Sequence, residues 1–93
     1  MSASSEKHVS LNEDKYVWKE VGDSVVVLQF ETGAYWTLNE TGSAIWKLIL
    51  GRKSKSEIVA KVCVEFEVET VTAEADYDEM INFCIEKEML EVD

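Results

Sequence analysis

Short runs of alternating or continuous hydrophobic residues near the start of the chain predict three β-strands. They are Tyr16–Glu20, Ser24–Phe30 and Ala34–Leu38, all rich in aromatic and β-branched residues. Each of the two intervals between them contains a glycine, Gly22 or Gly33, a residue that readily adopts the positive φ of tight hairpin turns. The pattern therefore predicts a three-stranded antiparallel meander with Ser24–Phe30 in its centre.

Hydrophobic residues then recur at helical spacing in three further segments. The first, from about Glu40 to Leu50, follows capping residue types and stops at Gly51, and the second opens at Ser54 with the spacing of a capping box. The third extends from about Thr72 to Lys87 and has a wide apolar stripe. Three strands followed by three helices predict an α+β domain of winged helix-turn-helix-like architecture.

The third predicted strand has no charged residue, although it lies at an edge of the predicted meander. The other edge strand carries Lys19 and Glu20, and charged side chains are a common protection against unwanted strand pairing. An unprotected edge is either an aggregation hazard or a place where another extended peptide pairs. The strand Ala34–Leu38 is therefore a candidate docking edge.

The charge of the chain is strongly negative and unevenly distributed. Of the 93 residues, 19 are acidic and 9 basic, and the whole balance of −10 lies in residues 65–93, which hold eleven acids and only Lys87 as a base. The third predicted helix has acids where a helix that reads DNA needs Arg, Lys, Asn or Gln. Such a surface repels phosphate backbones and anionic membranes, so neither nucleic acid nor membrane is an expected partner.

The first fourteen residues are polar and predict a disordered N-terminal tail ahead of one folded domain, residues 15–93. No segment approaches the apolar run of a signal peptide or the roughly 20 apolar residues of a membrane span, so a cytoplasmic protein is expected. The only histidine, His8, falls in the predicted tail. Cys63 and Cys84 lie in apolar helical patterns and are expected to be buried, reduced thiols.

Catalytic and metal-binding patterns are missing from the sequence. The predicted domain has no histidine to act as a base, neither cysteine has a polar companion in sequence, and no phosphate-binding glycine loop or metal-ligand spacing occurs. The sequence therefore predicts a non-enzymatic protein without a cofactor or a bound metal.

One motif, which joins the third strand to the first helix, is more specific than the rest. It reads Gly33-x-Tyr35-x-x-Leu38-Asn39-x-Thr41-Gly42-x-x-Ile45-Trp46-x-Leu48, and Asp76-x-x-x-Met80-Ile81 and Met89-Leu90-Glu91 follow it. This pattern resembles the PqqD-like family of RiPP precursor recognition elements, small domains that hold the leader of a ribosomally made peptide. Within this family, the sequence motif is most similar to that of the stand-alone leader-binding proteins of lasso peptide biosynthesis. Glu88 stands where such domains usually have a glycine that ends the third helix.

The resemblance implies that a leader peptide adds as an antiparallel strand beside the third strand, in a groove closed by the third helix. A separate maturation protease or cyclase would then receive the peptide. The site residues implied are Tyr35, Trp36, Thr37, Leu38, Asp76, Tyr77, Glu79, Met80 and Phe83. For Trp36 and Tyr77 a place in the core is an equal alternative, and strand alternation lets only one of the pairs Tyr35/Thr37 and Trp36/Leu38 face the core.

The alternative function is a winged-helix module for protein–protein interaction or regulation. It would bind a folded protein, or a second copy of itself, through the same exposed edge.

Overall fold

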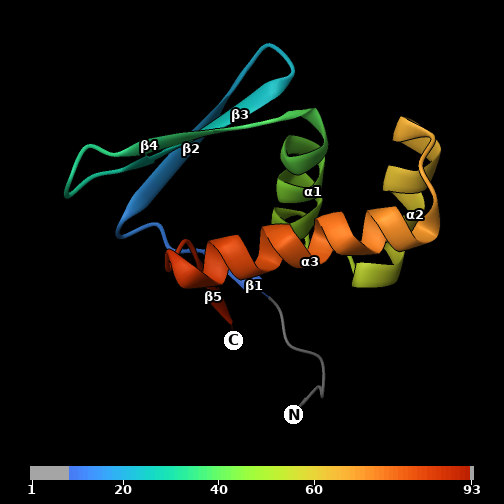
Figure 1. Ribbon diagram of the computed structural model, residues 1–93. Helices are drawn as coiled ribbons and strands as arrows, with labels where there is room; N and C mark the ends of the chain where they lie inside the picture. Colours follow the sequence, from blue (N-terminus) through green and yellow to red (C-terminus); the bar gives the residue numbers. More distant parts are fainter. Residues whose placement is uncertain (1–8, 93) are drawn as a thin grey trace.

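A computed structural model describes residues 9–92 of the chain. Its elements in chain order are β1 (Val9–Leu11), β2 (Tyr16–Val21), β3 (Ser24–Gln29), β4 (Tyr35–Leu38), α1 (Glu40–Leu50), α2 (Lys55–Phe66), α3 (Thr70–Glu86) and β5 (Leu90–Val92). Strands β2, β3 and β4 form an antiparallel sheet in that order, and β1 pairs with β5 (Figure 1). The predicted α+β order of three meander strands and three helices is confirmed.

The helix boundaries follow from capping side chains. The Asn39 side chain accepts a hydrogen bond from the Gly42 N–H at 2.7 Å and starts α1. Ser54 and Glu57 form the predicted capping box of α2, and the hydrogen bond from the Ser54 backbone N–H lowers the pKa of the Glu57 carboxyl. Helix α3 begins at Thr70, slightly earlier than the sequence predicts. None of the helices within residues 9–92 is long and apolar enough to cross a membrane.

Residues with positive φ turn the chain between elements. Gly22 (φ 63°) and Gly33 (φ 76°) lie in the two hairpins of the meander, as predicted. Glu88 (φ 58°) adopts the same left-handed conformation between α3 and β5. The backbone at Glu88 therefore takes the turn for which the family resemblance expects glycine.

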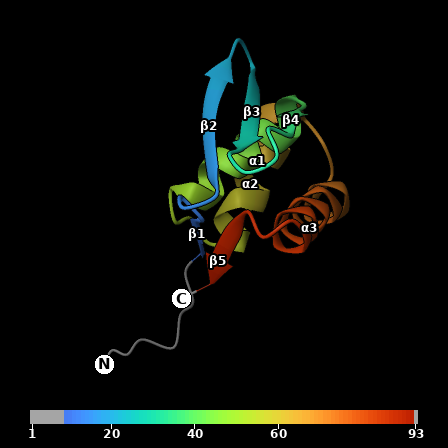
Figure 2. The ribbon, with the colours of Figure 1, turned by 90° about the vertical axis from the view of Figure 1, so that its left-hand side faces the viewer.

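The core lies between the inner face of the meander and the three helices. Strand alternation directs Val25 and Val27 inward, and both are fully buried. Trp46 of α1 packs beneath the sheet, edge to face with Trp18 of β2 at 6.2 Å between ring centroids. Figure 2, turned by 90°, shows that β4 is the strand on the α3 side of the sheet and that β2 lies on the far side.

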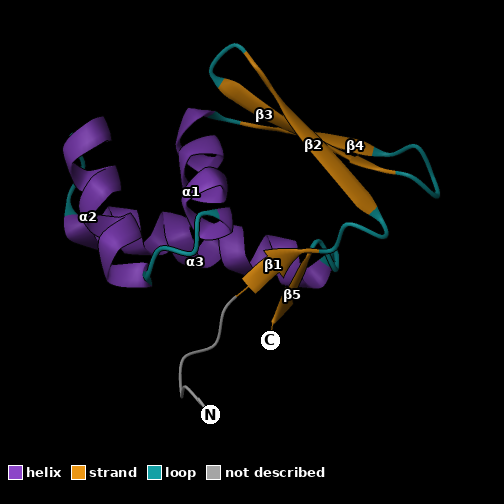
Figure 3. Ribbon diagram, turned by 180° about the vertical axis from the view of Figure 1, so that it is seen from behind, coloured by secondary structure: helices purple, strands orange, loops and turns teal. Residues whose placement is uncertain are grey.

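The outer face of the meander is apolar and open to solvent in the described part of the chain. The strand register places Val17, Leu28 and Tyr35 directly beside one another on three neighbouring strands, and all three are exposed. The helices lie on the opposite side of the sheet (Figure 3). The sheet therefore contributes one face to the core and leaves the other uncovered.

The segment before β2 departs from the prediction of a disordered tail over residues 1–14. Residues 1–8 lie outside the described residues, but Val9–Leu11 forms β1, antiparallel to β5, and Asn12 is buried. The sequence analysis missed both short strands because each has only three residues, and the pairing joins the two ends of the chain. Residues 9–14 are thus part of the fold.

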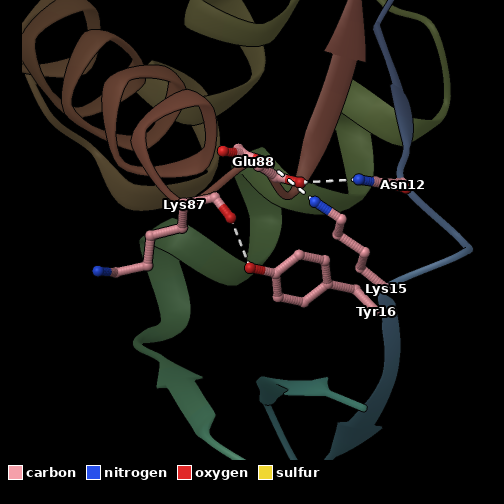
Figure 4. A network of polar contacts seen from close by, with 5 residues as sticks. All are labelled: Asn12, Lys15, Tyr16, Lys87 and Glu88. Carbon is pink, nitrogen blue, oxygen red and sulfur yellow. Dashed lines mark hydrogen bonds and ion pairs between the residues drawn. The ribbon is translucent and has the colours of Figure 1, made fainter. Parts of the chain in front are cut away.

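Polar contacts fasten this segment to the end of α3, and we call them the N-terminal clamp (Figure 4). The Asn12 side chain donates to the Glu88 carbonyl at 3.2 Å, the Tyr16 hydroxyl donates to the Lys87 carbonyl at 2.5 Å, and Lys15 pairs with the Glu88 carboxylate at 3.0 Å. Burial raises the pKa of the Tyr16 hydroxyl, which keeps it a donor. The clamp satisfies carbonyl groups that the helix itself leaves unpaired.

Ser43 joins α1 to the sheet from inside the core. Its hydroxyl accepts a hydrogen bond from the Val25 N–H at 2.8 Å and donates to the Leu38 carbonyl at 3.1 Å, and its exposure is only 1%. The hydroxyl thus completes the β3–β4 ladder at the point where the chain leaves the sheet for the helix.

We predict that Ser43→Ala destabilises the protein by about 2 kcal/mol or more, because it leaves a buried N–H and a buried C=O without partners. Urea unfolding followed by tryptophan fluorescence measures this change. Ser56→Ala, at an exposed serine of α2, is the matched control and is expected to change stability by less than about 0.5 kcal/mol. Equal effects at both positions would contradict the role of Ser43.

The two cysteines are free thiols in different environments. Cys84 is fully buried on α3, and burial raises its pKa to about 12, whereas Cys63 on α2 is half-buried. The prediction of burial is therefore confirmed for Cys84 and only partly for Cys63.

We predict that a thiol reagent at pH 8 modifies Cys63 while Cys84 reacts only after unfolding. With a pKa near 12, about one Cys84 in ten thousand is a thiolate at that pH, and its sulfur has no path to solvent. Mass spectrometry of the labelled protein with and without urea checks the order. Fast labelling of Cys84 in the native protein would show that α3 opens readily.

Candidate functional site

A groove of about 460 Å³ separates the free edge of the meander from α3. One wall is β4 with the start of α1, and the other is the middle and C-terminal half of α3. The lining residues are Trp36, Thr37, Leu38, Asn39, Thr41, Gly42, Ile45, Asp76, Glu79, Met80 and Phe83.

Strand alternation decides which side chains of β4 line the groove floor. Leu38 is buried and Trp36 is half-buried, whereas Tyr35 and Thr37 point to the solvent side of the sheet and are exposed. The Trp36 ring lies between Tyr16 and Phe83, at 6.3 Å and 6.4 Å between ring centroids. Trp36 therefore serves both the core and the groove.

The outer edge of β4 is unpaired in the described part of the chain, because its only neighbour in the sheet is β3. The N–H of Gln29 donates to the Ala34 carbonyl at 2.8 Å, so Ala34 bonds toward β3. Backbone groups alternate in an antiparallel pair, and the N–H and C=O groups of Tyr35 and Thr37 consequently point away from β3. These outward groups form the pairing edge of the groove.

Helix α3 supplies a stripe of side chains to the opposite wall. Asp76, Glu79, Met80 and Phe83 are spaced by three or four residues, which places them on one helix face. A Cβ atom added to Gly42 would lie 2.8 Å from the Cε of Met80, so the start of α1 approaches α3 closely here. Glycine at this position leaves room for the methionine beside the groove.

Two carboxylates line the groove, and one ammonium group lies over two of its aromatic rings. Asp76 and Glu79 line it and take part in none of the ion pairs of residues 9–92. Asp78, by contrast, points elsewhere and pairs with Lys55 at 3.2 Å. The Lys87 ammonium lies 5.5 Å from the ring centroids of Trp36 and Phe83, at the other end of the groove.

The structure brings seven of the nine site residues expected from the sequence together around this groove. They are Trp36, Thr37, Leu38, Asp76, Glu79, Met80 and Phe83. Their role in binding a peptide stays a prediction.

Tyr35 and Tyr77, the other two expected site residues, do not line the groove, and their role in binding a peptide also stays a prediction. Tyr35 is 68% exposed and lies on the outer face of the sheet, because its neighbour Trp36 takes the inner position. Tyr77 lies on another face of α3, where it packs against the core beneath the Lys55 ammonium, 5.5 Å from the ring centroid. Burial raises the pKa of the Tyr77 hydroxyl. Tyr35 contributes only its backbone to the pairing edge.

Four lining residues at the strand-to-helix junction were not among the expected site residues. They are Asn39, Thr41, Gly42 and Ile45. All four belong to the motif on which the family resemblance rests. Capping explains Asn39 and Thr41, and helical spacing explains Ile45, so the sequence indicated only a structural role for these three. The available signal was Gly42, because a glycine in the first turn of a helix indicates a close approach by a neighbouring element.

The described residues contain no candidate metal-binding cluster. Within residues 9–92 no group of three or more His, Cys, Asp or Glu side chains lies close enough to hold a metal ion. The groove instead combines an unpaired strand edge, an apolar floor and charged ends, which are the features that recognise an extended peptide.

Comparisons with known proteins agree with this geometry. The family model described as coenzyme PQQ synthesis protein D (PqqD) matches residues 24–90. A solved structure described as TbiB1 in complex with the TbiA(beta) leader peptide is 35% identical, with a TM-score of 0.77, and the match covers 88% of this chain and 94% of that one. A second, described as lasso peptide synthetase B1 complexed with the leader peptide, is 25% identical with a TM-score of 0.80, over 90% and 98% of the two chains. A comparison with curated proteins gave no match.

The family match extends from the first residue of β3 to the first residue of β5 and includes both walls of the groove. The identity to the TbiB1 structure extends over most of both chains, and the fold agrees along nearly the whole length. The resemblance predicted from the motif around Leu38, Thr41 and Trp46 is thereby confirmed. This chain belongs to the PqqD family.

Proposed function

We propose that this protein binds the leader segment of a ribosomally synthesised precursor peptide and delivers it to a separate maturation protease or cyclase of lasso peptide biosynthesis. The protein itself does not catalyse a reaction, carries no cofactor and acts in the cytoplasm. The leader lies in the groove between β4 and α3 as an additional antiparallel strand.

The observation that carries this proposal is the unpaired edge of β4 beside the groove. Tyr35 and Thr37 direct backbone donors and acceptors outward, and a peptide strand satisfies them without any change in the β3–β4 ladder. Both solved structures similar to this chain are described as complexes with a leader peptide. The β4 edge of this chain has the outward backbone groups that an added peptide strand needs.

Side-chain anchors supply the affinity and the choice of peptide. The apolar floor formed by Leu38, Ile45 and Met80, with Trp36 and Phe83 at one end, buries apolar residues of the leader. Alternate residues of an extended peptide point to one face, so anchors two residues apart enter the groove together. The remaining leader side chains face outward beside the exposed row of Tyr35, Leu28 and Val17.

Delivery is a matter of effective concentration. A protein that holds a leader while it contacts the enzyme raises the local concentration of the attached core peptide at the active site. The groove lies between β4 and α3. The outer face of the meander, on the side of the sheet away from the helices (Figure 3), is exposed, so a bound leader leaves this second surface free.

We predict that a synthetic TbiA(beta) leader peptide changes the fluorescence of this protein saturably, because bound peptide alters the environment of Trp36. Trp36→Phe removes the responding ring and retains an apolar one, so it should lose most of the signal while calorimetry still detects binding. Trp18 and Trp46 pack against each other in the core and should respond little. If this leader and the leader of the second similar complex both fail to bind, the proposed function is wrong.

We predict that Thr37→Pro abolishes pairing at the β4 edge. The Thr37 N–H points away from β3, so proline removes a donor for the leader without breaking the sheet, as is tolerated on edge strands. The affinity should fall about tenfold or more, whereas far-ultraviolet circular dichroism should stay that of the wild type. Thr37→Val, which keeps the N–H, is the control and should bind nearly normally. Equal affinity for both variants would exclude strand addition here.

We predict that Gly42→Ala weakens leader binding without destabilising the fold. The added methyl displaces the flexible end of Met80 into the groove, while alanine improves the helix propensity of α1 by up to about 1 kcal/mol. Crowding of a packed site costs about 1 kcal/mol or more, roughly a fivefold loss of affinity. Gly51→Ala at the far end of α1 does not touch the groove and serves as the control in calorimetric titrations and urea unfolding.

A further inference from the structure

The charged groups of the groove are separated along its length. Asp76 and Glu79 lie toward one end, and the Lys87 ammonium lies over the aromatic rings at the other. Residues 76, 79, 83 and 87 are spaced by three or four and share one face of α3 and its C-cap. The helix therefore presents a negative and a positive end to the same bound segment.

Contacts between the two walls show in which direction α3 runs relative to β4, and therefore where its negative and positive ends lie along that strand. Trp36, early in β4, lies beside Phe83, and Gly42, after β4, lies beside Met80, so α3 runs antiparallel to β4. A guest strand antiparallel to β4 consequently runs parallel to α3. Its N-terminal side lies by Asp76 and Glu79, and its C-terminal side lies by Lys87.

The two ends are a defined number of residues apart. Lys87, the C-cap of α3, follows Asp76 by eleven positions, which is about 16 Å at 1.5 Å per residue. An extended strand covers that distance in about five residues at roughly 3.3 Å each. Side-chain reach widens this to a spacing of about four to six residues in the guest.

Lys87 is available for a partner of opposite charge. None of the three ion pairs of residues 9–92 includes it, and its backbone carbonyl, not its ammonium, takes part in the N-terminal clamp. Figure 4 shows its side chain extending away from Tyr16 and Lys15. Glu88, the adjacent acid, is already paired with Lys15. The ammonium therefore rests on Trp36 and Phe83, where a carboxylate of a bound peptide reaches it from the groove.

We propose that the groove selects its leader by charge polarity: a Lys or Arg on the N-terminal side of the bound segment, then apolar anchors, then an Asp or Glu about four to six residues after the cation. This inference rests on the proposed function and adds the orientation and charge order of its ligand. Lys87 is the specificity-determining residue at the C-terminal side. Exposed pairs of this kind contribute modestly each, and a peptide of the opposite polarity binds more weakly because it loses both pairs and meets like charges instead.

The test selects binders from a displayed library of random twelve-residue peptides against the full chain. Sequences enriched by the wild type should show a cation followed, four to six residues later, by an acid. The double variant Asp76→Lys/Lys87→Glu has the same net charge. Because Glu79 offsets the new lysine, this variant should lose the preference for a cation on the N-terminal side and enrich a cation in place of the acid on the C-terminal side. A wild-type peptide should lose roughly tenfold in affinity for that variant at low salt, and less at high salt.

Lys55→Glu/Asp78→Lys is the matched control, because it reverses an exposed ion pair outside the groove without changing the net charge. Its selected peptides should keep the wild-type charge order. Lys87→Gln should relax the preference for the acid and leave that for the cation. The inference is overturned if the selected peptides bind the groove but show no charge order, or if they show the same order for the wild type and the double variant. The proposed function would stand in either case. If the wild type enriches no peptide that the Thr37→Pro variant fails to bind, both the charge-polarity inference and the proposed function are wrong.

Discussion

An apolar groove persists in water only if its walls are prevented from closing on each other, and this separation underlies the site of the present protein. The walls are β4 and α3, which belong to parts of the chain about forty residues apart. At one end the rings of Trp36 and Phe83 meet edge to face, and farther along the groove Met80 rests against Gly42. These two contacts hold β4 and α3 at a fixed separation, so the groove is a consequence of packing and not of missing side chains.

The N-terminal clamp also helps to keep the walls apart, since it anchors the end of α3 to the segment that enters the sheet. Tyr16 is the shared residue: its ring packs against Trp36 and its hydroxyl donates to the Lys87 carbonyl. Fixing α3 in this way also protects the edge of β4. A second sheet cannot approach an edge that faces a helix, whereas a single narrow strand can enter, so the edge is selective without charged residues of its own.

The local sequence pattern was sufficient to predict the three meander strands and the three helices, because residues within or next to each element determine it. The meander follows from β-forming residues separated by Gly22 and Gly33, and α1 follows from the Asn39 cap. The motif around Leu38 and Thr41 was enough to identify the family, since it joins a strand and a helix in consecutive residues. The pairing of β1 with β5 had no such local cause and was missed, because only the folded chain brings its ends together.

The sequence by itself determined the order of the three meander strands and the three helices, the uncharged edge of β4 and the acidic composition of α3. Tertiary structure decided which face each side chain occupies: it turned Tyr35 to the outside and Trp36 to the groove, and it paired Asp78 with Lys55. It also brought Lys87, a plain cation in the sequence, over two aromatic rings. Charge and periodicity can be read from the order of residues. Which side chains face each other across the groove depends on how the folded chain packs, because packing fixes the distance between the walls.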